Sequence, residues 1–302
     1  MNSGEMDESF VLNFAPTGMI PRRSHNPNLP VDPDEIARDV EQAVKLGITV
    51  VHLHARNADE SPSCDASVYA DIVRRIRTFA PDLVVCLSLS GRYKQEFEAR
   101  AAPLTLTGSL KPDMASLTLS SLNFSRDASV NAPDMVERLA VEMLRRGIMP
   151  ELEVFDGGMI NYARLLIGRD LLQPPLYFNL ILGNPASAQA DPLTLGTMMA
   201  QLPAPCLWSV GGIGRAQTLA AVLGLAAGGG VRVGLEDNLF FDSARKRFAS
   251  NAELLERVLD VAGKLGRRAM KPSEFRSRMN LYPGNGDHGR PARTVAGDRL
   301  LS

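Results

Sequence analysis

His52 and His54 are the residues whose types and spacing most clearly suggest chemistry in this chain. They end an apolar run that begins at Ile48, and side chains two residues apart in a strand point to the same face. Two imidazoles on one face at a strand end supply half of a transition-metal site. Two packed or surface histidines would give the same tripeptide, so the metal hypothesis needs a third ligand.

The elements that must position these residues are short strand-like runs that alternate with amphipathic helical stretches. The expected strands are 10–15, 49–54, 83–88, 114–118, 151–155, 176–182, 206–210 and 230–234, and the expected helices are 33–46, 66–79, 96–101, 133–146, 159–167, 193–202, 216–226 and 252–265. Strict alternation predicts an α/β fold with a parallel sheet, and eight strand–helix pairs are the number that closes a TIM (β/α)8 barrel. A doubly wound open sheet is the alternative, but no Gly-x-Gly-x-x-Gly fingerprint follows the first strand.

We predict that the catalytic barrel is a single domain over residues 1–279. Residues 280–302 are rich in Gly, Pro and charge, and we expect a C-terminal extension that contacts a neighbouring subunit or stays mobile.

The predicted eighth strand offers the third ligand. Barrel active sites lie at the C-terminal ends of the strands. With a period of two, Arg232 and Glu236 share one face, and the apolar residues between them take the other, so both charged side chains should face the barrel interior. Glu236 then completes a two-histidine, one-carboxylate site that suits Zn²⁺ or another divalent metal. A structural ion pair between Arg232 and Glu236 is the simpler alternative.

Two other strand ends carry polar groups. Glu153 shares a face with Glu151 and Phe155 on the fifth strand, where a buried carboxylate is costly without a role. It is therefore a candidate acid or base, or an acceptor that orients the substrate. The segment from Ser88 to Arg92 follows the third strand and offers hydroxyls, backbone N–H groups and a guanidinium for a carboxylate or oxyanion. An ordinary loop explains that segment nearly as well.

Composition excludes several partner classes. A net charge of −1 gives no electrostatic case for nucleic acid or an anionic membrane. No apolar stretch approaches ~18 residues, and the polar, acidic opening does not resemble a signal peptide. The three cysteines are odd in number and lack metal or redox spacing, which favours reduced thiols and a cytoplasmic location.

The chain resembles the β-keto acid cleavage enzymes, the 3-keto-5-aminohexanoate cleavage enzyme group, up to about Met279. The matching segments are Thr17-Gly18, Pro27–Pro30, His52–Arg56, Lys111–Leu117, Asn123-Phe124, Pro150–Asp156, Gly211–Arg215, Arg232–Asn238 and Asn251–Leu254. Their ordered occurrence is highly specific for this family.

The resemblance implies a TIM barrel with a divalent metal, usually zinc, bound by His52, His54 and Glu236. It implies that a β-keto acid and acetyl-CoA, as co-substrate, give acetoacetate and a new acyl-CoA. It also implies catalytic roles for four other side chains: the Arg232–Asp237 pair in proton transfer and charge stabilisation, the Ser88 hydroxyl near the substrate, and the glutamate Glu153 on the fifth strand.

Departures from the family pattern bear on the substrate. Ile20 stands where the amino-keto acid enzymes carry a glutamate, and an apolar side chain cannot pair with an ammonium, so we expect a substrate without an amino group. We expect Arg92, with Arg22 or Arg23, to meet an anionic or polar tail, unless Arg92 pairs with a neighbouring acidic side chain. The predicted substrate-binding residues are Ser116, Arg92, Gly91, Ser90, Ile20 and Asn123.

Three alternatives remain beside this reading. A metal-dependent aldolase or lyase that does not use CoA needs the same side chains. A non-catalytic barrel that binds a metabolite is less consistent with an intact set of polar groups. A hydrolase of the amidohydrolase type needs further histidines, and none lies between His54 and His288. The family resemblance also leads us to expect a homotetramer or homodimer.

Overall fold

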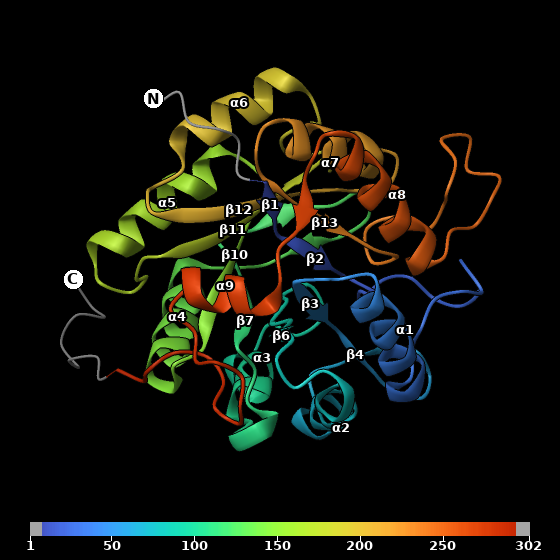
Figure 1. Cartoon of the computed structure of the whole chain (residues 1–302). Coiled ribbons are helices and arrows are strands. Elements are labelled where there is room, and N and C mark those ends of the chain that lie inside the picture. Colours follow the sequence, from blue (N-terminus) through green and yellow to red (C-terminus); the bar gives the residue numbers. More distant parts are fainter. Residues whose placement is uncertain (1–7, 294–302) are drawn as a thin grey trace.

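The computed structural model describes residues 8–293, and its centre is a closed barrel of parallel strands (Figure 1). The barrel strands are β2 (Leu12–Phe14), β3 (Val50–Leu53), β6 (Val84–Leu87), β7 (Met114–Thr118), β10 (Met149–Val154), β11 (Leu176–Leu182), β12 (Cys206–Gly212) and β13 (Gly230–Val233). Strands that follow one another in this order are neighbours in the barrel, and β13 pairs with β2 to close it. The predicted TIM barrel is therefore confirmed.

Helices surround the strands (Figure 1). They are α1 (Pro33–Lys45), α2 (Ala66–Phe79), α3 (Phe97–Ala101), α4 (Pro133–Arg146), α5 (Gly157–Gly168), α6 (Pro192–Gln201), α7 (Ala216–Ala226) and α8 (Asn251–Lys264). Local sequence signals mark where helices begin. At the start of α1, the Asp32 side chain accepts a hydrogen bond from the backbone N–H of Glu35, and the Glu35 side chain accepts one from the backbone N–H of Asp32, which is a capping box. Their apolar faces pack on the outward side chains of the strands and form most of the core.

A short terminal unit closes the N-terminal end of the barrel. β1 (Ser9–Phe10) pairs in parallel with β14 (Arg268–Ala269), and α9 (Pro272–Arg278) follows. Met270, Phe275 and Met279 pack in one cluster with Val50 and Met114, which begin two barrel strands. Figure 1 shows α9 lying across the strands at this end. A ligand therefore reaches the barrel from its C-terminal end.

Smaller elements were not predicted from the sequence. Two antiparallel hairpins follow barrel strands, β4 (Ala55–Arg56) with β5 (Pro62–Ser63) and β8 (Leu122–Asn123) with β9 (Ala128–Ser129). Two 3₁₀ turns, Ala102–Thr105 and Gly108–Leu110, connect α3 to β7.

The predicted C-terminal extension is described only as far as residue 293, and residues 1–7 and 294–302 lie outside the described part of the chain. Within it, the Arg290 guanidinium donates to the backbone carbonyls of Gln173, Pro175 and Met279. The boundary at residue 279 stays a prediction, as does the oligomeric state. Over residues 8–293, every helix is too short or too polar to cross a membrane.

Candidate active site

His52, His54 and Glu236 converge at the C-terminal end of the barrel. His52 lies in β3 and His54 directly after it, and their Nε2 atoms are 3.3 Å apart. Glu236 Oε1 lies 3.1 Å from His54 Nε2 and 3.9 Å from His52 Nε2. The three potential ligand atoms thus surround one point, and all three side chains are largely shielded from solvent.

Glu236 reaches this point by a route that differs from the prediction. β13 ends at Val233, so Glu236 does not share a strand face with Arg232. The chain turns at Gly234, where φ is +153° and a Cβ atom would lie 2.0 Å from the carbonyl oxygen of Ala15. Gly18 then leaves room for Glu236, since a Cβ at Gly18 would lie 2.6 Å from Glu236 Cγ. Two glycines therefore permit the turn that aims this carboxylate.

Glu151 fixes the orientation of His52, a role that the sequence analysis missed. Its Oε2 lies 2.5 Å from His52 Nδ1, deep in the barrel. The negative charge favours a hydrogen on Nδ1 and leaves Nε2 directed toward His54 and Glu236. Burial alone would lower the pKa of His52, but the Glu151 carboxylate overrides this and raises it to about 9.

Glu151 belongs to a polar layer inside the barrel. Its Oε1 accepts hydrogen bonds from the amides of Asn13 (2.6 Å) and Asn179 (2.7 Å). The Tyr177 hydroxyl donates to Ser209 Oγ and lies beside both amides. The signal for this layer was present in the sequence as single polar residues inside apolar strands, each on the lumen face.

Cys86, His52 and Glu151 form a second group of potential metal ligands. Both carboxylate oxygens of Glu151 already have hydrogen-bond partners. Oε1 accepts from the two asparagine amides, and Oε2 contacts His52 Nδ1 and lies 3.2 Å from Cys86 Sγ. We read this second group as support for His52 rather than as a separate metal site.

Arg232 gathers the remaining carboxylates. Its guanidinium donates to Asp237 at 3.0 Å, to Glu236 Oε1 at 2.6 Å and to Glu153 Oε1 at 3.3 Å. Burial by itself would lower the pKa of Arg232, but the charges of Asp237, Glu236 and Glu153 raise it, so the guanidinium stays cationic. Glu153 also accepts a hydrogen bond from the Thr118 hydroxyl at 2.7 Å.

Asp237 is held differently from its neighbour Glu236. Burial raises the pKa of Asp237 to about 6, and the charge of Glu236 adds to that effect, although Arg232 opposes it. For Glu236, burial acts in the same upward direction, but His54 and Arg232 outweigh it and lower the pKa. The two adjacent carboxyls are therefore separated in acidity by their surroundings.

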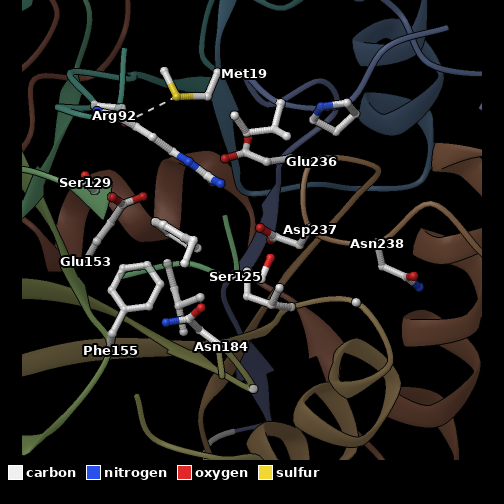
Figure 2. Close-up of a pocket in the computed structure, with 18 of the residues that line it drawn as sticks. Met19, Arg92, Ser125, Ser129, Glu153, Phe155, Asn184, Glu236, Asp237 and Asn238 are labelled. Atoms are coloured by element: carbon white, nitrogen blue, oxygen red, sulfur yellow. Dashed lines mark hydrogen bonds between the residues drawn. The ribbon is translucent and has the colours of Figure 1, made fainter. Parts of the chain in front are cut away.

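A cavity of about 490 Å³ opens above these groups. Figure 2 shows Arg92, Ser129 and Glu153 on one side of it and Asp237 and Asn238 on the other. Apolar side chains line much of the wall, and the carboxylates of described residues that line it are Glu153, Glu236 and Asp237. The apolar lining residues include Met19, Ile20, Leu122, Phe124, Phe155 and Ile181.

The predicted substrate-binding residues divide into two groups. Ile20, Ser90 and Arg92 line the cavity, as does Ser88, for which a catalytic role was predicted. The other three, Gly91, Ser116 and Asn123, are not among the described residues that line the cavity. Ser116 is buried, and its hydroxyl accepts a hydrogen bond from the backbone N–H of Leu89. Asn123 is exposed, and its backbone carbonyl accepts a hydrogen bond from the Asn184 amide. Gly91 is closely packed, since a Cβ there would clash with the Val130 carbonyl and the Arg100 guanidinium. These three support loops around the cavity.

Arg92 pairs with a neighbouring acidic side chain, as the alternative anticipated, and its contact with a substrate tail stays a prediction. Its guanidinium pairs with Asp127 at 2.6 Å and stacks on the Phe124 ring, 3.9 Å from the centroid, yet it also lines the cavity. Arg23 instead pairs with Glu35 and Glu60, and neither Arg23 nor Arg22 is among the described residues that line the cavity. The structure therefore does not bring Arg22 or Arg23 to the cavity wall beside Arg92.

Comparison with known proteins identifies the family. A sequence profile described as beta-keto acid cleavage enzyme matches residues 9–281. The chain belongs to the β-keto acid cleavage enzyme family. The resemblance inferred from the sequence motifs is thus confirmed, and the protein is an enzyme rather than a non-catalytic barrel.

Relatives of this β-keto acid cleavage enzyme differ in the substrates that they are named for. A 3-keto-5-aminohexanoate cleavage enzyme of Fusobacterium nucleatum is 35% identical over 91% of this chain and 99% of that protein. A 3-oxoadipate:acetyl-CoA acetyltransferase of Cupriavidus necator is 33% identical over 91% of this chain and 96% of that protein.

A solved structure supports the fold of this family member. The ternary complex of ObcA with a C4-CoA adduct and oxalate has a TM-score of 0.74 at 23% identity, covering 84% of this chain and 68% of that chain.

Proposed function

We propose that this enzyme converts a β-keto acid and acetyl-CoA into acetoacetate and a new acyl-CoA at the cavity above His54 and Glu236. The observation that carries the proposal is the buried set of Arg232, Asp237 and Glu236 beside two imidazoles, in a chain of this family. Relatives named for acetyl-CoA-dependent reactions add support.

The donor set fits a divalent metal. Two imidazole nitrogens and one carboxylate that converge on one point suit Zn²⁺, and such a site keeps open positions for substrate. Glu236 supports this, because its Oε2 is buried and lacks a hydrogen-bond partner within residues 8–293. When bound by His52, His54 and Glu236, the metal would polarise the ketone of the β-keto acid.

The remaining residues handle the proton and the charges. Asp237 is the group that we assign to remove a proton from the carbon between the ketone and carboxylate, and to return it to the product. Arg232 holds Asp237 in place and balances its charge. The Ser88 hydroxyl accepts the backbone N–H of Ser90 at 3.3 Å, so its hydrogen can be donated to a substrate oxygen. Glu153, fixed by Thr118, orients Arg232.

The cavity wall favours a substrate that lacks an amino group. Ile20 lines the cavity where an ammonium would need a carboxylate. Arg92 can donate to an anionic or polar tail, and Asp127 positions it while offsetting part of its charge. We therefore propose keto diacids as the first substrates to examine.

The reaction is tested with metal-loaded protein, acetyl-CoA and a panel of β-keto acids, with acetoacetate as the readout. We expect acetoacetate that depends on acetyl-CoA and disappears in His52→Ala, since an imidazole ligand is lost. Keto diacids should rank above uncharged β-keto acids of equal length, and the reverse ranking would reject the role of Arg92. Cleavage without acetyl-CoA would instead indicate a CoA-independent lyase.

Glu151→Gln should lower metal affinity about 10-fold or more, because the charge that sets the tautomer of His52 is removed. The measurement is competition with a chromophoric chelator, which needs no turnover. Cys86→Ser is the matched control, since it changes the other group at the same oxygen without touching the His52–Glu151 contact. Equal affinity in wild type and Glu151→Gln would contradict the positioning role.

A further inference from the structure

The connection from β13 to α8 carries a group that the proposed reaction does not use. We call residues 238–249 the rim loop. Arg245 lies in this loop and lines the active-site cavity, although it is exposed. No carboxylate pairs with Arg245 or Lys246 within residues 8–293, whereas Arg247 in the same loop pairs with Glu253. The Arg245 guanidinium therefore stands at the mouth of the cavity without an ion-pair partner among these residues, and the exposed Lys246 follows it in the chain.

The rim loop is built to hold Arg245 in place. The Phe240 and Phe248 rings stack 5.4 Å apart, and the Arg245 guanidinium lies 4.6 Å from the Phe240 centroid. Asp242 accepts the backbone N–H groups of Lys246 and Arg247, so its carboxylate is occupied by the loop itself. A loop with these internal contacts loses little freedom when it binds a ligand.

The backbone of Arg245 is also strained. Its φ is +57°, in the left-handed region that residues other than glycine seldom occupy. Such conformations persist where the surroundings enforce them, and they cluster at ligand-binding positions. Here the hydrogen bond from the Arg245 N–H to the Asp242 carbonyl helps to enforce it.

A second loop adds a polar side chain beside the first. The connection from β2 to α1 carries Arg22 and His25, both exposed, and His25 lines the cavity. Asn26 fastens the two loops together, because its amide donates to the carbonyls of Leu239 and Ala249, at 2.9 Å each. The Arg22 guanidinium instead donates to the backbone carbonyl of Asp59 and is not among the described residues that line the cavity.

The geometry points to a binding subsite for the phosphate groups of coenzyme A on the rim loop, centred on Arg245. Coenzyme A carries its thioester at one end of a long arm and a polyanionic nucleotide at the other. If the thioester reaches Asp237, the phosphates stay at the mouth, where the Arg245 guanidinium can attract them and donate hydrogen bonds to them. This inference rests on the proposed use of acetyl-CoA.

The opposite side of the cavity suits the β-keto acid instead. Figure 2 shows Asn238, the first residue of the rim loop, across the pocket from Glu153 and Phe155. Arg92 on that far side is already paired with Asp127. We therefore assign the two anionic substrates to different walls, the acid near Arg92 and the nucleotide near Arg245.

The test compares acetyl-CoA with acetyl-pantetheine, which carries the same thioester without the nucleotide. In Arg245→Glu we expect KM for acetyl-CoA to rise about 10-fold or more, from a lost charge-assisted hydrogen bond and added repulsion. KM for acetyl-pantetheine and for the β-keto acid should stay within about 2-fold. Arg245→Gln should give a smaller rise in the same direction. Arg145→Glu, an equal charge reversal at the exposed end of α4, is the control.

Direct binding of CoA, measured by calorimetry with wild type and Arg245→Glu, separates this inference from the proposed reaction. Weaker CoA binding in the variant supports the subsite even if no β-keto acid is turned over. An unchanged CoA affinity overturns it, as does an equal rise in KM for both thioesters. Wild-type affinity for CoA should also fall with added salt, and more steeply than that of Arg245→Glu.

Discussion

Asp237→Asn is expected to lower kcat/KM about 10³-fold while the metal content stays at the wild-type level. Asparagine has nearly the same shape but cannot accept the proton, and general-base catalysis contributes effects of this size. Asp237 contacts Arg232 and does not belong to the three converging ligand groups. The measurements are steady-state kinetics and metal analysis on the same protein preparation.

Glu236→Gln supplies the contrast for that experiment. It changes the adjacent residue, but there we expect metal content and activity to fall together, because Glu236 is a ligand in the proposed site. Loss of metal in Asp237→Asn would refute its assignment as the base. Full activity in Asp237→Asn with metal retained would do so as well.

The elements of the fold were largely predictable because local signals mark them. Asp32 and Pro33 mark the start of α1, and α2, α4 and α7 span the residues predicted from periodicity. The short α9 was missed, since seven residues with a charged sequence carry little periodicity. Its position depends on Phe275, which fills the end of the barrel from far along the chain.

The candidate site was predictable in its ligand types but not in its geometry. Alternation along β3 brings His52 and His54 into proximity as expected, although His54 lies just beyond the strand. Strand alternation predicted correctly that Glu236 faces the barrel interior, but for the wrong reason. Glu236 lies in the turn after β13 and not in the strand. A period of two holds only while the backbone stays extended, and the glycine at 234 ends that state.

Contacts between distant segments were beyond the reach of sequence patterns. Arg92 meets Asp127 across two loops, and Glu151 meets His52 across the barrel. Glu151 shared the predicted inward face with Glu153, but nothing local distinguished the carboxylate that supports a histidine from the one that holds Arg232. Such pairings depend on the closure of the barrel, which brings inward side chains of β10 and β3 together although two strands lie between them.

Asp113 should be the largest single contributor to stability among the buried charges at the N-terminal end of the barrel. Its carboxylate is fully buried and accepts two hydrogen bonds from Arg276, at 2.7 and 2.9 Å, and one from Arg77 at 3.1 Å. The backbone N–H groups of Val85 and Gly289 also donate to it. Asp113 therefore joins β6 to α9 and to the segment that follows it.

Asp113→Ala is expected to reduce the free energy of unfolding by about 3–5 kcal/mol, since it leaves two buried guanidinium groups without their carboxylate. Denaturant unfolding followed by circular dichroism measures this change. The matched control is Asp260→Ala, which removes an exposed partner of Lys264 and should cost at most about 1 kcal/mol. Equal losses in the two variants would show that the Asp113 network adds nothing beyond a surface pair.

The pH dependence of stability gives the same carboxylate a distinct signature. Burial by itself would raise the pKa of Asp113, but His288, Arg276 and Arg77 outweigh it and hold the pKa far below the ordinary value. A carboxyl whose pKa is depressed by folding stabilises the protein above its unfolded pKa of about 3.9, and that stabilisation is lost as the pH falls below it. Asp113→Asn should therefore be less stable than wild type at pH 7, and the difference should shrink between pH 4 and pH 2. A difference that stays constant over this range would mean that the charge of Asp113 is not what joins α9 to the barrel.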